Sequence, residues 1–488
     1  FKKEFVRHSA ILHGIELLTV KREDACCVKR NYVRSIYDYF SLSEDESKNR
    51  TEALKIEPFY ITNWEKLHDT YVGVKRPEDL TVCYLCGPEP DNDFKEFMNL
   101  GVLPHNIWGF EVNSQNYNKA ISFYNQGTYP QPRILKQNVE TFFQQTPKKF
   151  DIIYIDACGS IPSVQHALRT ITTICQYHRL NSPGIIISNF AEPDNSKESI
   201  EEYYDLITLY LFFKTFPLLE SSCLETRDRC DEYLSLYDNV IQNFAFYYGE
   251  FISAVLRDIP SILVPLQRFA RNPFINQLFD ISEFDKVVIS ELTVNHSLAK
   301  FFFAMDNLNR KGALNDKEKC FLNELGSYND LIKGLKIITL LKQHNIKLKD
   351  DVKLIENFFE SSEKIYQFLD KPHSNIFFDV IINQLAYPLH YNTEQNIRYK
   401  YMAKSTSMYM DITIYDECRY IYEWLPALHQ IVSAFENSSW QYVFRFALDG
   451  LVKSRKRYNN EFFFQGSVVP SSVDEFKDKE IRDRVNIN

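Results

Sequence analysis

Glycine is scarce in this sequence, with 14 residues among 488, whereas a share of roughly 7% is usual. Half of them fall between residues 73 and 184: Gly73, Gly87, Gly101, Gly109, Gly127, Gly159 and Gly184. The repeated glycines of a dinucleotide-binding loop are absent, which excludes an enzyme that uses a nicotinamide cofactor. Gly87 and Gly159 directly follow predicted strands, where a glycine lets the backbone approach a ligand closely.

Long hydrophobic runs are also missing. No apolar stretch reaches the roughly 18 residues that a membrane helix needs, and the richest one, Ile207 to Phe213, is short and flanked by charge. We therefore expect no membrane partner.

The ten cysteines lack the spacing of a disulfide framework. Cys83 and Cys86 have CxxC spacing, but they lie on or just after an apolar strand and no second pair follows nearby. Buried thiols are therefore favoured over a metal or redox site. A chain of this length does not need disulfides, so we expect a reducing, cytoplasmic compartment.

An excess of basic residues is missing too. The chain has 56 Lys and Arg against 65 Asp and Glu, a net charge of −9. This balance argues against a surface coated with basic side chains for nonspecific nucleic-acid binding, although it leaves room for a local basic groove. A hydrophobic share of 44% and a charged share of 25% are typical of a globular protein.

The length predicts more than one domain. We divide the chain into a helical cap over 1–60, an α/β domain over 61–220, a mainly helical domain over 221–470 that binds a substrate or a partner, and a polar, loose tail over 471–488. The boundaries follow changes in hydrophobic patterning and polar stretches such as Ser41 to Thr51.

Short apolar runs alternate with helical patterns in the second part. Strands are predicted over 81–85, 106–112, 133–137, 150–155 and 184–189, and helices over 91–100, 114–124, 162–178 and 197–216. This alternation predicts a mostly parallel sheet with helices on both faces, the doubly wound, Rossmann-like α/β class. The continuous apolar runs 152–155 and 185–187 are typical of strands buried on both sides.

Helical periodicity dominates the remainder. Amphipathic helices are predicted over 231–257, 297–309, 350–369, 416–435 and 439–456, with one strand over 408–414 and an edge strand over 461–465. The cations Lys453, Arg455, Lys456 and Arg457 end the last helix, where they either complement the helix dipole or contact nucleic-acid phosphates.

A turn and an acidic residue follow the first two strands of the predicted sheet. Gly87 ends the first strand, and Glu111 ends the second, 24 residues later. Because the carboxyl ends of neighbouring strands flank the ligand crevice of a doubly wound sheet, both residues should border the same crevice. A carboxylate at that place can accept hydrogen bonds from both ribose hydroxyls of an adenosyl group.

The charge of the first turn indicates which adenosyl ligand fits. Glu89, Asp91 and Asp93 would repel a pyrophosphate. S-adenosylmethionine has no phosphate and carries a sulfonium and an ammonium, so an acidic loop suits it. The alternative role of Asp91 is to cap the following helix.

Residues 80–190 resemble a class I S-adenosylmethionine-dependent methyltransferase. Gly87 matches the family's glycine turn and Glu111 its ribose-binding acid, while Asn138 matches the polar residue that reads the adenine. Asp156, in Ile155-Asp156-Ala157-Cys158, matches the motif after the fourth strand that faces cofactor and substrate. The resemblance implies a cofactor site formed by Cys86, Gly87, Glu89, Glu111, Asn138 and Asp156. Pro88 and Pro90 stand where a typical member has further glycines.

Asp156, Cys158 and Ser160 are the candidate catalytic residues. RNA 5-methylcytosine enzymes resemble this stretch with a nucleophilic cysteine, but the proline that precedes it there is absent here, and a packed cysteine is the alternative. Asp156 would serve as a general base or orient the substrate. We expect no metal, because Ser188-Asn189 replaces the Asp-Asn pair of metal-dependent O-methyltransferases.

Two hypotheses about function stay open. The first is an S-adenosylmethionine-dependent methyltransferase that acts on a nucleic acid or a small molecule, chosen by the helical domain. The second is a catalytically inactive methyltransferase fold that serves as a scaffold or sensor and binds a protein partner through the helical domain. The sequence leaves oligomerisation open under both hypotheses.

Overall fold

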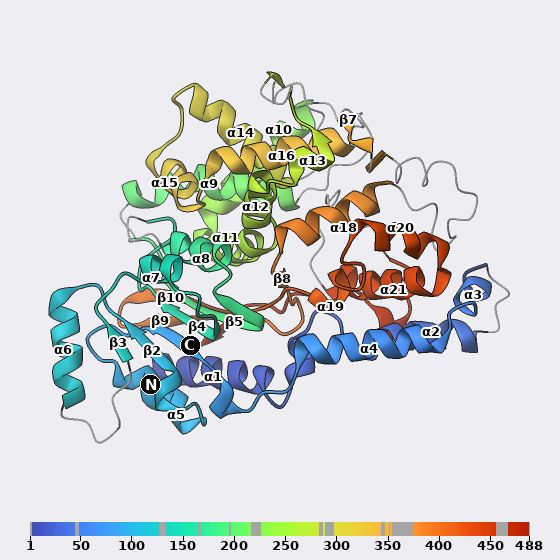
Figure 1. Ribbon diagram of the computed structural model, residues 1–488. Coiled ribbons are helices and arrows are strands. Elements are labelled where there is room, and N and C mark those ends of the chain that lie inside the picture. Colours follow the sequence, from blue (N-terminus) through green and yellow to red (C-terminus); the bar gives the residue numbers. More distant parts are fainter. Residues whose placement is uncertain are drawn as a thin grey trace.

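In the computed structural model, a nine-stranded mixed sheet forms the centre of the protein (Figure 1). The structure describes residues 2–43, 48–125, 133–163, 167–194, 197–215, 226–282, 286–287, 297–342, 347–350, 352–353, 374–454 and 467–487. The strand order is β11-β9-β10-β5-β4-β1-β2-β3, and β8 pairs with β10. The sheet and its helices confirm the Rossmann-like, mostly parallel class with a large helical part.

The parallel half of the sheet contains the five predicted strands, each within a few residues of its expected bounds. They are β1 (Val82–Leu85), β2 (Ile107–Phe110), β3 (Arg133–Leu135), β4 (Phe150–Asp156) and β5 (Leu180–Ala191). The connecting helices are α5 (Asp91–Asn99), α6 (Ser114–Asn125), α7 (Val139–Gln145) and α8 (Ala167–Gln176). The chain runs outward from β1 through β2 to β3 and then returns to β4 beside β1, so the switch point lies between β1 and β4.

The other half of the sheet comes from the C-terminal part of the chain. The predicted strand over 408–414 is confirmed as β10 (Thr406–Asp416), which runs antiparallel to β5 and to β9 (Ile397–Ala403). β8 (His390–Tyr391) pairs with the end of β10. The expectation of a loose tail is wrong, because β11 (Val485–Ile487) pairs with β9.

Most of the helical part lies between β5 and β9, two strands of one sheet. It comprises α9 (Lys197–Thr215), α10 (Thr226–Gln242), α11 (Phe244–Asp258), the π-helix η4 (Ile259–Leu263), α12 (Val264–Arg271), α13 (Ile275–Leu278), α14 (Ser297–Arg310), α15 (Asp316–Glu324), α16 (Tyr328–Lys342) and α18 (Ser374–Ala386). The short strands β6 (Phe279–Asp280) and β7 (Lys347–Leu348) pair with each other. The division of the chain into four domains stays a prediction.

The remaining helices flank this sheet at the two ends of the sequence. The first group is α1 (Lys2–Leu18), η1 (Arg22–Ala25), α2 (Tyr32–Leu42), α3 (Lys48–Ala53), α4 (Pro58–Val72) and η2 (Pro77–Asp79), while the short η3 (Pro104–Asn106) lies between α5 and β2. The second is α19 (Arg419–Tyr422), α20 (Leu428–Glu436), α21 (Ser438–Ser454) and η7 (Asp474–Phe476). No helix in the described ranges combines the length and the apolarity that a membrane crossing requires.

Two predicted helices have different bounds in the structure. The helix expected over 231–257 is divided at Asn243 into α10 and α11. The helix expected over 416–435 is replaced by the end of β10 and the separate helices α19 and α20. The helix expected over 350–369 and the edge strand over 461–465 fall mainly or wholly outside the described residues.

Two hydrophobic cores cover the two faces of the sheet. Along β4, Ile152 and Tyr154 belong to the core beneath α1 and α5, whereas Ile153 and Ile155 belong to the larger core on the opposite face. This alternation follows from the two-residue period of a strand. Figure 1 shows α1 and α5 below the sheet and α8 and α11 above it. Cys83 and Cys86 belong to different cores, so their side chains lie on opposite faces of the sheet, as expected for buried thiols.

Candidate functional site

A cavity of about 420 Å³ opens at the carboxyl ends of β1, β2, β3 and β4. These ends meet at the switch point of the sheet, where ligands bind in doubly wound folds. All six predicted cofactor residues line the cavity: Cys86, Gly87, Glu89, Glu111, Asn138 and Asp156. Their shared position agrees with the sequence expectation, while their contact with a cofactor stays a prediction.

Gly87 provides a direct test of whether the cavity suits a ligand. Its φ is +57°, in the left-handed region that glycine tolerates and other residues adopt at a cost. A Cβ built at Gly87 would have no heavy atom within 4 Å. The turn therefore leaves open space directly above the backbone, as required for a ligand that lies against it. Pro90, which replaces one of the further glycines, has no heavy atom in this space.

β1 and β2 pair in register, so Gly87 and Glu111 lie at adjacent strand ends. The Cys86 amide donates to the carbonyl oxygen of Phe110 over 3.1 Å. Glu111 Oε1 accepts a hydrogen bond from the Asn113 amide over 2.6 Å, which fixes the carboxylate at the end of β2. Gly87 and Glu111 thus border one crevice and not opposite edges of the sheet.

Asn138 has a role in local structure as well as a place in the cavity. Its Oδ1 caps α7 by accepting hydrogen bonds from the amides of Glu140 and Thr141 over 2.8 and 3.2 Å. Capping of this kind stabilises a helix by about 1 kcal/mol. The cap holds Asn138 at the rim, and it leaves the amide nitrogen as the group that can face a ligand.

The acids of the first turn have distinct surroundings. Glu89 accepts from Asn92 over 3.1 Å at the surface. Asp91 pairs with Lys95 over 2.7 Å within α5 and does not cap the helix, because Pro90 occupies that position. Asp93 is buried, and burial raises its pKa to about 6, although the neighbouring Arg7 opposes the shift.

Sequence analysis missed two basic residues of the site, Lys3 and Arg7 of α1, which line the cavity. Lys3 Nζ lies 3.0 Å from Asp156 Oδ2, and Arg7 Nε lies 2.8 Å from Asp93 Oδ1. Their spacing of four residues puts both cations on one face of an N-terminal helix. That spacing was the available signal, but it did not reveal which part of the sheet the helix would meet.

Asp156 is the centre of a polar cluster at the end of β4. Besides Lys3, its carboxylate accepts hydrogen bonds from Asn189 Nδ2 over 2.8 Å and from Cys158 Sγ over 3.2 Å. Asn189 Nδ2 also contacts the Tyr401 hydroxyl oxygen over 2.9 Å. Burial alone would lower the pKa of Lys3, but attraction by Asp156 outweighs it and the pKa is raised. Lys3 therefore stays positively charged beside this carboxylate.

The other two candidate catalytic residues have different environments. Cys158 lines the cavity and is exposed there, but partial desolvation together with the Asp156 carboxylate raises the pKa of its thiol to about 12. A nucleophilic cysteine needs a thiolate, so this environment favours Cys158 as a hydrogen-bond donor. Ser160 is outside the cavity lining, and its Oγ accepts from the Tyr203 hydroxyl over 3.0 Å.

The loop after β4 is held by the helical part. The buried carboxylate of Glu324, in α15, accepts hydrogen bonds from the amides of Ser163 and Leu168 over 3.0 and 2.9 Å. Because Leu168 lies in the first turn of α8, this carboxylate also stabilises the positive end of the helix dipole. The helical part thereby fixes the segment that carries Cys158 and Ser160.

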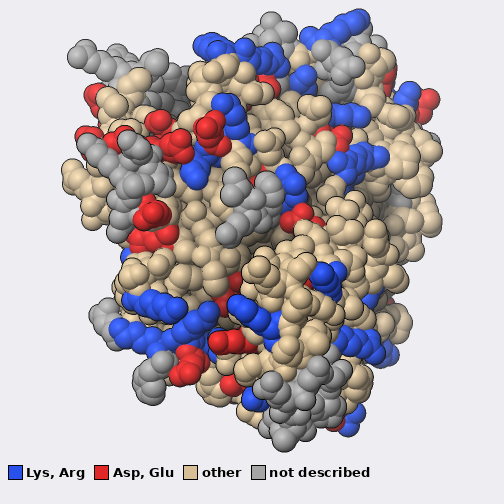
Figure 2. Space-filling model, turned by 90° about the vertical axis from the view of Figure 1, so that its left-hand side faces the viewer, with Lys and Arg blue, Asp and Glu red and all other residues tan. Residues whose placement is uncertain are grey.

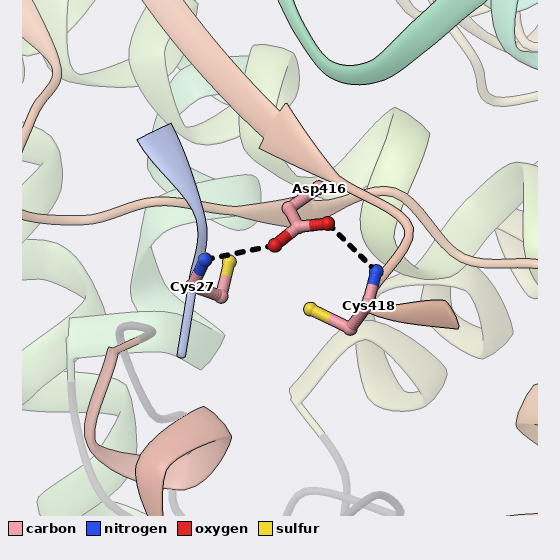
Figure 3. Close-up of side chains that lie close together, drawn as sticks. All are labelled: Cys27, Asp416 and Cys418. Atoms are coloured by element: carbon pink, nitrogen blue, oxygen red, sulfur yellow. Dashed lines mark hydrogen bonds between the residues drawn. The ribbon is translucent and has the colours of Figure 1, made fainter. Parts of the chain in front are cut away.

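A second group with metal-ligand chemistry lies elsewhere, at the end of β10. Cys27, Asp416 and Cys418 are buried with their ligand atoms within 4.8 Å of one another (Figure 3). The Asp416 carboxylate already accepts from the amides of Cys27 and Cys418 over 2.9 and 2.8 Å, and from Ser182 Oγ and the Tyr420 hydroxyl over 3.0 and 2.6 Å. Four donors occupy its lone pairs, so we assign this carboxylate a structural role.

Comparisons with known proteins find solved structures of methyltransferases, all at low similarity to this chain. No family model and no curated protein matches the sequence. Similar solved structures include a methyltransferase of Clostridium acetobutylicum with 16% identity, 33% of this chain and 58% of that chain covered, and a TM-score of 0.18. A methyltransferase of Archaeoglobus fulgidus has 14% identity, with 36% of this chain and 68% of that chain covered and a TM-score of 0.18. A plantazolicin methyltransferase has 12% identity, with 52% of this chain and 75% of that chain covered and a TM-score of 0.21. Scores this low carry no functional argument.

Proposed function

We propose that this protein is an S-adenosylmethionine-dependent methyltransferase. The observation that carries the proposal is the convergence of the left-handed Gly87 turn and the Glu111 carboxylate on one open cavity at the switch point of the sheet. The strand order supports it, because the switch point between β1 and β4 is the place where doubly wound sheets bind their ligands.

The charges of the cavity suit this cofactor. Glu111 would accept hydrogen bonds from the ribose hydroxyls, and Asn138 would face the adenine. The amino-acid end of S-adenosylmethionine is a zwitterion, and Arg7 and Asp93 place a cation and a carboxylate side by side in the lining. Glu89 adds negative charge to the lining, which would suit the positively charged sulfonium.

The bound cofactor would supply an activated methyl group. Transfer breaks the bond between sulfur and the methyl carbon, forms a bond from that carbon to the acceptor, and releases a proton where the acceptor group carries one. Asp156 lies at the cavity edge with Lys3 and Asn189 fixing its carboxylate, so we assign it to orient the acceptor or receive that proton. Holding the two reactants in line supplies most of the catalysis in such a transfer.

Thermal unfolding with and without S-adenosylhomocysteine tests cofactor binding. We expect the ligand to raise the unfolding temperature of the wild type, because it binds only the folded state. Glu111→Ala should remove this rise, whereas Glu78→Ala, which changes an exposed carboxylate of η2 outside the cavity, should retain it. A wild type that shows no rise at millimolar ligand contradicts the proposal and supports the inactive scaffold that binds a protein partner.

A further inference from the structure

We propose that the surface around β3, the strand at one edge of the sheet, binds nucleic acid. This β3-edge surface carries the cations Lys119, Arg133, Lys136 and Lys148, and it borders the cavity at the switch point, which we call the first cavity. Under the proposed methyltransferase function, on which this step rests, the methyl acceptor is a nucleic acid. The binding of nucleic acid itself does not depend on that function.

The segment from 112 to 150 has a local excess of positive charge. It contains five Lys and Arg but only one acid, Glu140, in a chain whose net charge is −9. The segment forms α6, β3, α7 and the start of β4, so the excess lies along one edge of the sheet. The single acid is engaged by α8, because Glu140 Oε1 accepts a hydrogen bond from Thr170 Oγ1 over 3.0 Å. Positive charge gathered on one face is the electrostatic footprint of a nucleic-acid-binding surface.

The four cations of this surface are not neutralised by acidic side chains. None of them forms an ion pair with another residue that the structure describes, whereas the fifth cation, Lys149, lies 3.9 Å from Glu417. The segment 126–132, which leads into β3, lies outside the described residues, and its sequence contains no Asp or Glu. Lys119, Arg133 and Lys136 are exposed. Their charges are therefore available to the phosphates of a ligand.

Aromatic rings hold three of these cations in place. The Arg133 guanidinium lies 4.6 Å from the centre of the Trp108 ring, and the Lys148 ammonium lies 5.2 Å from the same ring. The Lys136 ammonium lies 5.8 Å from the ring of Tyr117, on α6. Desolvation and repulsion by Arg133 lower the pKa of Lys148. Two like charges thus share one ring, and a phosphate beside them would offset their repulsion.

The β3-edge surface is continuous with the rim of the first cavity. Lys136 is followed directly by Gln137 and Asn138, and both of these residues line the cavity. Val112 lines it as well, and α6 begins two residues later, at Ser114. A nucleic acid bound along β3 would therefore lie at the mouth of the cavity that we assign to the cofactor.

The neutral side chains around the cations favour nucleic acid over an acidic protein. Of the 39 residues from 112 to 150, 11 are Asn or Gln, whose amides contact both phosphates and base edges. Phe123, on α6, has 45% of its surface exposed, and an exposed ring can stack on a base. Figure 2 shows the side of the molecule on which Figure 1 places α6 and β3, and Lys and Arg side chains cover more of its lower half than Asp and Glu side chains do.

The salt dependence of binding tests this inference. The probes are a fluorescein-labelled single-stranded oligouridylate and a labelled DNA duplex, each measured by anisotropy at several salt concentrations. Lys119→Ala and Lys136→Ala should each lower the slope of log affinity against log salt, by about 0.7 for the single strand and about 0.9 for the duplex. The matched control is Lys66→Ala, which removes an exposed cation of α4 outside this surface and should keep the wild-type slope. Because all three side chains are exposed, the variants should unfold at the wild-type temperature.

The outcomes separate this inference from the proposed function. Lower slopes with the single strand alone support a single-stranded acceptor, and lower slopes with the duplex alone support a double-stranded one. The inference is overturned if neither probe binds, if both variants keep the wild-type slope, or if labelled polyglutamate binds as tightly as the nucleic acids at the same salt concentration. Thermal unfolding with S-adenosylhomocysteine tests the proposed function independently. If that ligand fails to bind while the slopes change as expected, the nucleic-acid surface is upheld and only its acceptor role is overturned.

Discussion

Replacing Gly87 by alanine separates the stability of the turn from the ligand capacity of the cavity. An L-residue in the left-handed region costs about 1–2 kcal/mol, and the φ of Gly87 is +57°. The added Cβ would meet no heavy atom within 4 Å, so no steric cost adds to this value. We expect Gly87→Ala to fold and to lose about 1–2 kcal/mol of unfolding free energy.

Ligand binding should suffer more than stability in the same variant. A ligand at 100 times its Kd stabilises the folded state by about 2.7 kcal/mol. The new methyl group would occupy space that the cofactor needs beside the backbone, so S-adenosylhomocysteine should no longer raise the unfolding temperature of Gly87→Ala.

Gly312 supplies a matched control for this experiment. Its φ is +66°, and a Cβ there would also have no heavy atom within 4 Å. Gly312 follows α14 and is outside the cavity lining. Gly312→Ala should therefore lose a similar unfolding free energy and keep the full effect of the ligand. If Gly87→Ala also keeps the full effect, the cofactor does not lie above this turn and the reasoning is refuted.

Three further predictions follow from the charged residues. Arg7→Ala should weaken the binding of S-adenosylhomocysteine about tenfold, as expected for the loss of a hydrogen bond to a charged group. The affinity for methylthioadenosine should stay unchanged, because this compound lacks the amino-acid end. Calorimetry with both ligands measures the two affinities, and an equal loss for both would contradict the prediction. Burial raises the pKa of Asp93 from 3.8 to about 6. Between these pH values only the folded protein keeps the proton, so the unfolding free energy should fall as the pH rises. Urea unfolding across this range should show a smaller fall of the unfolding free energy for Asp93→Asn than for the wild type. Arg484→Ala leaves the buried Asp411 without its cation and should cost about 3–5 kcal/mol in urea unfolding, whereas the exposed Arg482→Ala should cost little.

Local patterning predicted the strands that end at the first cavity, but it missed the helix α7, whose Val139 and Glu140 also line the cavity. The apolar runs of β1, β4 and β5, bounded by polar turns, fix strands that are buried on both sides. If these strands are assumed to be neighbours in a parallel sheet, their carboxyl ends must lie at the same edge. Gly87, Glu111 and Asp156 therefore line the same cavity. This part of the site could be predicted from the sequence because each of these residues lies at or just after the end of its own strand.

Pairings between distant segments were beyond the reach of local patterns. Nothing in 406–416 specifies that β10 joins β5 rather than a separate sheet, because the register depends on packing between segments far apart in the chain. Lys3 and Arg7 precede the sheet by many residues, and their places beside Asp156 and Asp93 depend on how α1 docks. A cavity lined by α11, β9 and β11 combines distant segments in the same way.

The polar atoms around α1 that lack a hydrogen-bond partner favour a ligand site over a retired scaffold. Arg7 Nε and Asp93 Oδ1 are buried and lie 2.8 Å apart, yet their geometry is not that of a hydrogen bond, and among the described residues neither atom has another partner. Asn189 Oδ1 is likewise buried without a hydrogen bond. Burial of the Arg7 and Asp93 charges costs desolvation free energy that their attraction over 2.8 Å only partly offsets, and apolar replacements of a buried ion pair are often neutral or stabilising. A domain kept only for its shape gains nothing from this cost, whereas a zwitterionic ligand would offer a carboxylate to Arg7 and an ammonium to Asp93.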